Sequence, residues 1–150
     1  MMIVHHREAI EMADLAADHA ASAEVKSLGE AISAAQGPEI ETMTEFWQAW
    51  DAEVLVGMSM EGMGGMSGMD MGAMRGAMTP EMMDQLMAAR GTAFDRMFLE
   101  MMTAHHNGAI EMARTEQAEG QNLQALELAA IIETDQSGEV EEMRQILASL

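Results

Sequence analysis

A chain of 150 residues suits one compact domain, and its composition favours helices, because Ala and Met are abundant and only five residues are aromatic. The formal net charge is −19 with only seven Lys and Arg residues, which disfavours binding to nucleic acid or to an anionic membrane and favours the attraction of cations. Cysteine is absent, so disulfides and thiolate metal sites are excluded, and twenty methionines supply sulfur instead.

The first predicted helix runs from about Met2 to His19, and a second helix follows it with Ser22 as N-cap. Gly37 and Pro38 interrupt the second helix. Because proline removes a backbone donor and clashes with the preceding turn, we expect a kink or a break near 34–37. The apolar stripe of this helix recurs in steps of three and four residues, at Val25, Leu28, Ile32, Gln36, Ile40, Met43, Trp47 and Trp50.

The segment 57–78 reads GMSMEGMGGMSGMDMGAMRGAM, with eight methionines and seven glycines in 22 positions. Glycine at this density predicts a flexible linker that does not fold alone. Thr79, Pro80 and Glu81 then have the character of an N-cap, a first-turn proline and a first-turn acid. We therefore predict a short helix over about 80–90.

The last predicted helices repeat the plan of the first two. Thr92 is the predicted N-cap of a helix from Ala93 to about Ala118, which Gly120 stops. Asn122 then caps a final helix, and no proline matches Pro38 there, so this helix is expected to run through. Its stripe consists of Ala125, Ala129, Ile132, Gln136, Val140, Met143, Leu147 and Leu150.

An internal repeat relates the two halves of the chain. MMIVHHREAIEMA (1–13) and MMTAHHNGAIEMA (101–113) match at 9 of 13 positions, and the same offset pairs Glu39 with Glu139. The repeat units 1–50 and 101–150 should each form an antiparallel helical hairpin, which alone leaves its apolar stripe bare. We predict a single all-α domain over 1–150: a four-helix bundle of two pseudo-two-fold-related hairpins with a long Met/Gly-rich crossover.

A histidine doublet lies at the centre of each repeat copy, at His5-His6 and His105-His106. Residues three, four and seven apart share a helix face, so both doublets should lie on or beside the inward stripe, with methionines one or two turns away. Imidazole and thioether together suit copper in both common oxidation states better than magnesium or calcium. The alternative is that these histidines only satisfy hydrogen bonds in the core.

Thioethers in the linker are spaced Met-x-Met and Met-x-x-Met, where there is no core for methionine to fill. Such spacing lets them converge on a soft monovalent ion such as Cu(I) or Ag(I), and binding should persist at acidic pH because a thioether needs no deprotonation. The linker residues proposed as ligands are Met58, Met60, Met63, Met66, Met69 and Met71.

Gln36 and Gln136 occupy matching positions in otherwise apolar stripes. A buried amide costs stability unless it is hydrogen-bonded. One reading is that these residues hydrogen-bond to the imidazoles or to a bound ligand. The alternatives are that they lie exposed at the kink, or that they cap the kinked backbone.

Enzyme motifs are not recognisable. A ferritin-like di-iron centre needs a Glu-x-x-His pair on each of two helices, and no glutamate precedes a doublet histidine by three residues. We also find no nucleophile–base pair, phosphate-binding glycine loop or zinc-protease helix, so no enzymatic activity is expected. Besides metal binding, the open alternative is a non-catalytic structural or interaction module whose acidic surface docks a basic partner.

Four stretches, MMIVHHREAIEMA, AAQGPEIETM (34–43), FDRMFLEMMTAHHNGAIEMA (94–113) and QSGEVEEM (136–143), resemble the DUF305 family, which includes CopM-like copper proteins. The resemblance implies a ferritin-like bundle, usually exported to the periplasm or cell surface, that binds copper or silver in some members. Its implied role is metal buffering, chaperoning or resistance, with metal ions and a copper transporter or another copper protein as partners. The implicated ligands are Met2, His5, His6, Met12, Met102, His105, His106 and Met112.

Neither a signal peptide nor an apolar run long enough to span a bilayer is recognisable, so membrane insertion is not expected. Because nothing before Met1 corresponds to FDRMFLE (94–100), we expect the chain to be a trimmed or processed form. A periplasmic or secreted location is therefore an expectation from the resemblance alone.

Overall fold

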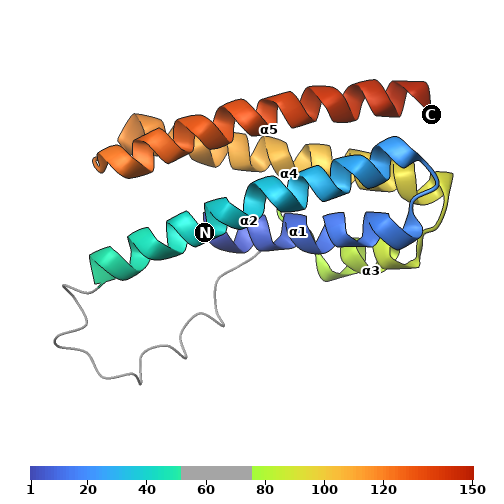
Figure 1. The fold of residues 1–150 in the computed structure, drawn as a ribbon, viewed down its shortest axis with the longest axis horizontal. Coiled ribbons are helices and arrows are strands. Elements are labelled where there is room, and N and C mark those ends of the chain that lie inside the picture. Colours follow the sequence, from blue (N-terminus) through green and yellow to red (C-terminus); the bar gives the residue numbers. More distant parts are fainter. Residues whose placement is uncertain (52–75) are drawn as a thin grey trace, which may run out of the picture.

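The computed structural model describes residues 1–51 and 76–150, and within these ranges the regular structure is entirely α-helical. The helices are α1 (Met2–His19), α2 (Ala23–Asp51), α3 (Pro80–Ala88), α4 (Thr92–Glu119) and α5 (Leu123–Ser149). The predicted all-α fold is confirmed (Figure 1).

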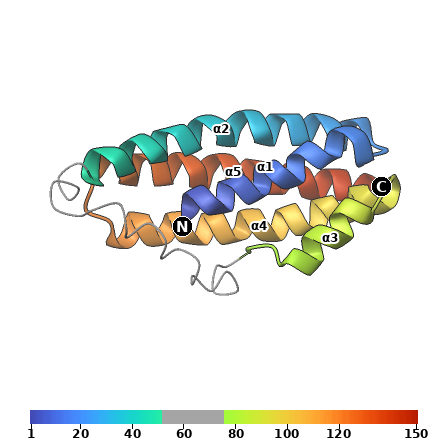
Figure 2. The same ribbon diagram turned by 90° about the horizontal axis from the view of Figure 1, so that it is seen from below.

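Two helical hairpins form the bundle, one from α1 and α2 and the other from α4 and α5. They meet mainly through α1 and α4, which run antiparallel to each other, while α2 and α5 contact each other less (Figure 2). The short α3 packs beside α1 and α4. The four-helix bundle thus places the first helix of each repeat unit at the centre of the molecule.

Three of the predicted N-cap residues make the expected hydrogen bonds to the first turn of their helices. The hydroxyl of Ser22 accepts hydrogen bonds from the backbone N–H groups of residues 24 and 25, at 3.2 and 3.4 Å. Thr79 accepts one from Met82 N at 3.2 Å, and Asn122 accepts two from residues 124 and 125. Because each cap satisfies donors that the first turn leaves unpaired, the starts of α2, α3 and α5 agree with the predictions.

The start of α4 differs from the prediction by one residue, and of the kink or break predicted in α2, the break does not occur. Gly91, at φ +65°, is the N-cap of α4, and Thr92 is already its first residue. The N–H of Gly91 donates to His19 O at 2.8 Å, so a contact with the end of α1 determines where α4 begins. No break occurs near 34–37, since α2 continues through Pro38. A proline removes only one bond from the helical ladder, and contacts with α1 at Gly29 before it and at Glu39 after it offset that loss.

Burial along the stripes also differs from the prediction at one end. In α2 the stripe is buried from Val25 to Gln36, whereas Trp47 is 51% exposed. The predicted last member, Trp50, has a side chain outside the described part of the structure. The hairpin core therefore ends before the last two turns of α2.

Glycine permits a close approach of α1 and α2. A Cβ atom added to Gly29 would lie 2.8 Å from Ala13 O and 2.9 Å from the Cβ of Ala16. No ordinary side chain fits there without a shift of one helix. This contact joins the two helices of the first hairpin about two turns of α1 after the histidine doublet.

A buried carboxylate, which we did not predict, ties the two hairpins together. Asp95 of α4 is 1% exposed and accepts hydrogen bonds from Ala21 N at 3.1 Å and Ser22 N at 3.0 Å. These donors belong to the turn between α1 and α2, more than seventy residues earlier. Charge-assisted bonds of this kind are stronger than neutral ones, so Asp95 fixes the turn against α4.

Candidate metal centre

The two histidine doublets face each other across the contact between α1 and α4. All four imidazoles are buried, and the rings of His5 and His105 lie with centroids 3.6 Å apart and planes tilted by 32°. His106 lies beside His105, with ring centroids 6.3 Å apart. The doublets therefore meet between the hairpins, and both point inward, as expected for residues on or beside the inward stripe.

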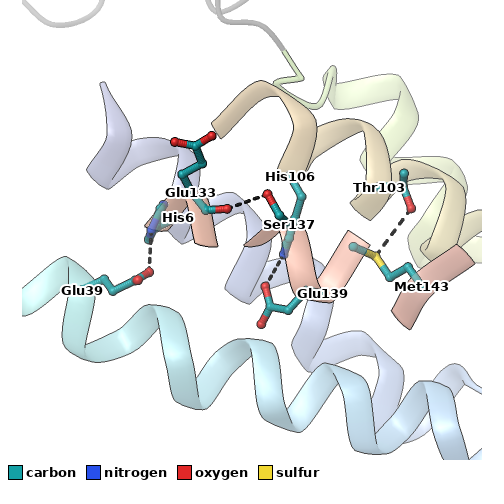
Figure 3. A network of polar contacts seen from close by, with 8 residues as sticks. All are labelled: His6, Glu39, Thr103, His106, Glu133, Ser137, Glu139 and Met143. Carbon is teal, nitrogen blue, oxygen red and sulfur yellow. Dashed lines mark hydrogen bonds and ion pairs between the residues drawn. The ribbon is translucent and has the colours of Figure 1, made fainter. Parts of the chain in front are cut away.

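A glutamate from the second helix of each hairpin reaches the second histidine of each doublet. His6 Nε2 lies 2.9 Å from Glu39 Oε2, and His106 Nε2 lies 2.7 Å from Glu139 Oε2. Figure 3 shows both pairs, with the carboxylates projecting from α2 and α5 toward the imidazoles. The same pair is thus built twice, at equivalent positions of the repeat.

His105 has a further carboxylate neighbour that breaks the symmetry. Glu8 Oε2 lies 3.5 Å from His105 Nε2, a long contact, and also 3.5 Å from Met78 N. The position equivalent to Glu8 in the second copy is Gly108, which has no side chain to offer His5. Burial lowers the pKa of His105 below its ordinary value of 6.5, and the nearby Glu8 carboxylate opposes this effect only in part.

The last three residues of the predicted linker, 76–78, pack on the bundle beside the same centre, contrary to the expectation that the linker has no core to fill. Gly76, at φ +79°, is so close to α4 that an added Cβ would lie 2.7 Å from Ala104 O and 3.0 Å from His105 O. Met78 is buried in the core next to it. The chain therefore returns from the linker to the bundle directly at the second doublet.

Several buried polar atoms of the doublets and of the two matched glutamines have no hydrogen-bond partner within the described residues. They are Nδ1 of His6 and His106, both ring nitrogens of His105, both amide atoms of Gln36, and Oε1 of Gln136. Burial of Gln36 and Gln136 excludes the reading that they are exposed at a kink, and the amide of Gln36 makes no bond to an imidazole in this structure. Such atoms are uncommon in folded proteins and often indicate a missing water or ion.

The structure divides the methionines that flank the doublets into two pairs. Met12 and Met102 are fully buried in the main core. Met2 and Met112 are partly exposed and line an apolar hollow of about 550 Å³ together with Met43 and Phe46. Each pair combines one methionine from each repeat unit, so a thioether from either hairpin is available on both sides of the doublets.

The donor set fits a soft or borderline ion better than a hard one. Within residues 1–51 and 76–150, no three side chains of His, Asp or Glu gather closely enough to hold a metal ion. An ion at the doublets would therefore need a thioether donor or a rotation of the imidazoles. The linker ligands Met58, Met60, Met63, Met66, Met69 and Met71 lie outside the described residues.

Sequence reasoning missed the carboxylates of this centre, Glu8, Glu39 and Glu139. Glu39 and Glu139 coincide in the repeat, and that coincidence was the available signal. Their distance of 33 residues from the histidines hides the contact, because it depends on how α2 and α5 pack on their partners.

Comparison with known proteins supports the family suggested by the motifs. The family model described as "Domain of unknown function (DUF305)" matches residues 1–147. Among curated proteins, none matches the chain significantly.

Among solved structures, the chain is similar to a Streptomyces coelicolor DUF305 protein named as a candidate secreted protein. The identity is 28% and the TM-score 0.81, over 99% of this chain and 86% of that one. It is also similar to CopM in its Cu(I)-bound form, with 29% identity and a TM-score of 0.78 over 99% of this chain and 91% of CopM. For the Cu(II)-bound form of CopM the values are 30%, 0.77, 99% and 92%.

None of the described helices is both long enough and apolar enough to cross a membrane.

Proposed function

Because this chain belongs to the DUF305 family, whose model spans residues 1–147, we propose that it binds copper or silver ions as cargo at the paired histidine doublets. The observation that carries this proposal is the group of buried imidazole Nδ1 atoms without a partner in the described residues, on His6, His105 and His106. A neutral imidazole nitrogen is a good ligand for copper, and thioethers extend the preference to Cu(I) and Ag(I).

The electrostatics of the centre favour cation binding. Burial keeps His105 neutral near pH 7, because it lowers the pKa of that imidazole, and a neutral ring has a lone pair to donate. Glu8, Glu39 and Glu139 place negative charge around the imidazoles and can balance a bound cation. CopM, to which the chain is similar, has been solved with Cu(I), Cu(II) and Ag bound, which supports the choice of ions.

Within this proposal the linker methionines and the doublets bind different ions. Met58, Met60, Met63, Met66, Met69 and Met71 take Cu(I) or Ag(I), whereas the doublets take Cu(II) or share a Cu(I). The protein then serves as a non-catalytic metal buffer, chaperone or resistance factor in the periplasm or outside the cell. Its partners are metal ions and a copper transporter or another copper protein. Similarity to a candidate secreted protein supports the location.

A structural or interaction module is the second candidate. The hydrogen bonds of His6 with Glu39 and of His106 with Glu139 favour it, because pairs of this kind also occur where their sole role is to satisfy buried polar groups. In that case the histidines would contribute to stability and to the choice of hairpin partner, but would bind no ion.

Equilibrium dialysis of the full chain against Cu(I), Cu(II), Ag(I) and Zn²⁺ separates the two candidates. We expect tight binding of the copper and silver ions. Replacement of His5 and His105 with alanine should remove Cu(II) binding, and the control His19→Ala should retain it. Binding no tighter than that of a scrambled-sequence control would support the interaction module instead.

A further inference from the structure

We propose, building on the function above, that Glu39 and Glu139 are positioning residues that hold the proton of His6 and His106 on Nε2, so that Nδ1 of each ring receives the cargo ion. The two glutamates lie on α2 and α5, outside the pair of helices that carries the doublets.

The hydrogen-bond geometry determines which nitrogen carries the proton. Glu39 Oε2 lies 2.9 Å from Nε2 of His6, and Glu139 Oε2 lies 2.7 Å from Nε2 of His106. An ionised carboxylate can only accept, so the imidazole nitrogen that faces it must donate. A neutral imidazole has one N–H group, and the lone pair is therefore left on Nδ1.

Burial of the opposite nitrogen supports the assignment. Nδ1 of His6 and Nδ1 of His106 are both buried and have no hydrogen-bond partner within the described residues. If the rings served only to satisfy core hydrogen bonds, both nitrogens would be expected to have partners. Instead, each ring has one satisfied edge toward a carboxylate and one unsatisfied edge in the interior.

The same arrangement occurs twice. Each glutamate lies 33 residues after its histidine, and both contacts join the first helix of a hairpin to its second helix. The side chains of Glu39 and Glu139 are 12% and 17% exposed, so the carboxylates retain some contact with solvent while the imidazoles do not. A carboxylate that accepts from the outer nitrogen of a metal-binding imidazole fixes the ring orientation and makes the other nitrogen a better donor.

The protonated nitrogen can be identified in the metal-free protein. Long-range ¹H–¹⁵N correlation spectra of the ¹⁵N-labelled full chain, treated with chelator, distinguish a protonated ring nitrogen from one with a lone pair. We expect the Nε2–H tautomer for His6 and His106. In Glu39→Gln and Glu139→Gln the amide can donate as well as accept, so a mixture of tautomers should appear in the affected ring only.

Ion affinity supplies the second readout. Loss of such a supporting carboxylate should weaken Cu(II) binding by about 10–100-fold. The controls Glu41→Gln on α2 and Glu142→Gln on α5 remove the same charge at exposed positions and should change the affinity little. The two glutamate variants test separate copies, so unfolding of one leaves the other informative.

Two outcomes would overturn the proposal. One is an Nδ1–H tautomer in the metal-free wild type, and the other is a Glu39→Gln and Glu139→Gln affinity equal to that of the controls. Either result leaves the proposed function intact if the wild type still binds copper. Failure of the wild type to bind any of these ions overturns the proposed function itself, and the role of the carboxylates with it.

Discussion

The rings of His5 and His105 lie against each other across the contact between α1 and α4, with centroids 3.6 Å apart and planes tilted by 32°. They are equivalent residues of the two repeat copies, and each belongs to a different hairpin. The contact between the two doublets is therefore formed only when the hairpins dock.

Shared use of the centre predicts that His5 and His105 do not act independently. The variants His5→Ala and His105→Ala should each lower Cu(II) affinity. The affinity of the double variant should be little lower than that of either single variant. Residues that act on one ligand in direct contact show such non-additivity. Titration of the three variants with Cu(II) measures it, and two additive losses would instead indicate two separate sites.

Protonation of His105 predicts how stability depends on pH. Burial lowers its pKa in the folded state below 6.5, so between the two values the unfolded chain binds more protons than the folded one. This contribution is complete above pH 6.5 and is lost as the pH falls toward the lowered pKa. We expect this group to lower the free energy of unfolding of the metal-free protein between pH 7.5 and 5.5.

Urea unfolding at both pH values checks the prediction. The variant His105→Gln, which removes the titrating group, should show a smaller decrease over the same range. An equal decrease in the two proteins would assign the pH dependence to other residues.

Thioether ligands predict a different response to acid. As the pH falls from 7 to 5, protons compete with Cu(II) for the imidazole nitrogens of the doublets, whereas thioethers are not protonated in this range. Cu(II) binding should collapse over this range, whereas Ag(I) binding should largely survive. A chain in which Met58, Met60, Met63, Met66, Met69 and Met71 are all replaced by leucine should lose the surviving part. If this variant keeps its full Ag(I) capacity at pH 5, the linker is not the Ag(I) site.

Replacement of Asp95 should lower the stability of the fold without changing ion binding. Asp95→Asn replaces one acceptor oxygen with a donor that faces the N–H groups of Ala21 or Ser22. We expect a loss of about 2 kcal/mol, as for buried bonds to a charged group. Thermal or urea unfolding measures it, with Asp84→Asn on the exposed face of α3 as the control. A loss no larger than that of the control would show that the turn holds without Asp95.

Close packing at Gly29 predicts opposite signs for one substitution at two sites. Gly29→Ala places a methyl group within 3 Å of Ala13 and Ala16 on α1 and should cost about 1–3 kcal/mol. Gly138→Ala, inside α5, places a methyl group where nothing lies within 4 Å, and should stabilise by about 0.5–1 kcal/mol. Urea midpoints of the two variants measure the difference, and equal shifts would contradict the packing argument.

Several elements of the fold could be predicted from the sequence because their causes are local. A cap acts on N–H groups two or three residues away, and an amphipathic stripe repeats every three or four residues, so Ser22, Thr79 and Asn122 mark helix starts reliably. The repeat at an offset of 100 residues added long-range information. It required the two doublets to occupy equivalent places, and burial of both confirms that they point inward.

Other features were decided only by the tertiary structure. The start of α4 at Gly91, the continuity of α2 through Pro38, and the contact of Asp95 with the turn before α2 all depend on neighbours distant in the chain. The same holds for the carboxylates of Glu8, Glu39 and Glu139 beside the imidazoles. Local patterns specify which face of a helix is buried, whereas the position of one helix along another is determined by close packing such as that of Gly29, which no local pattern records.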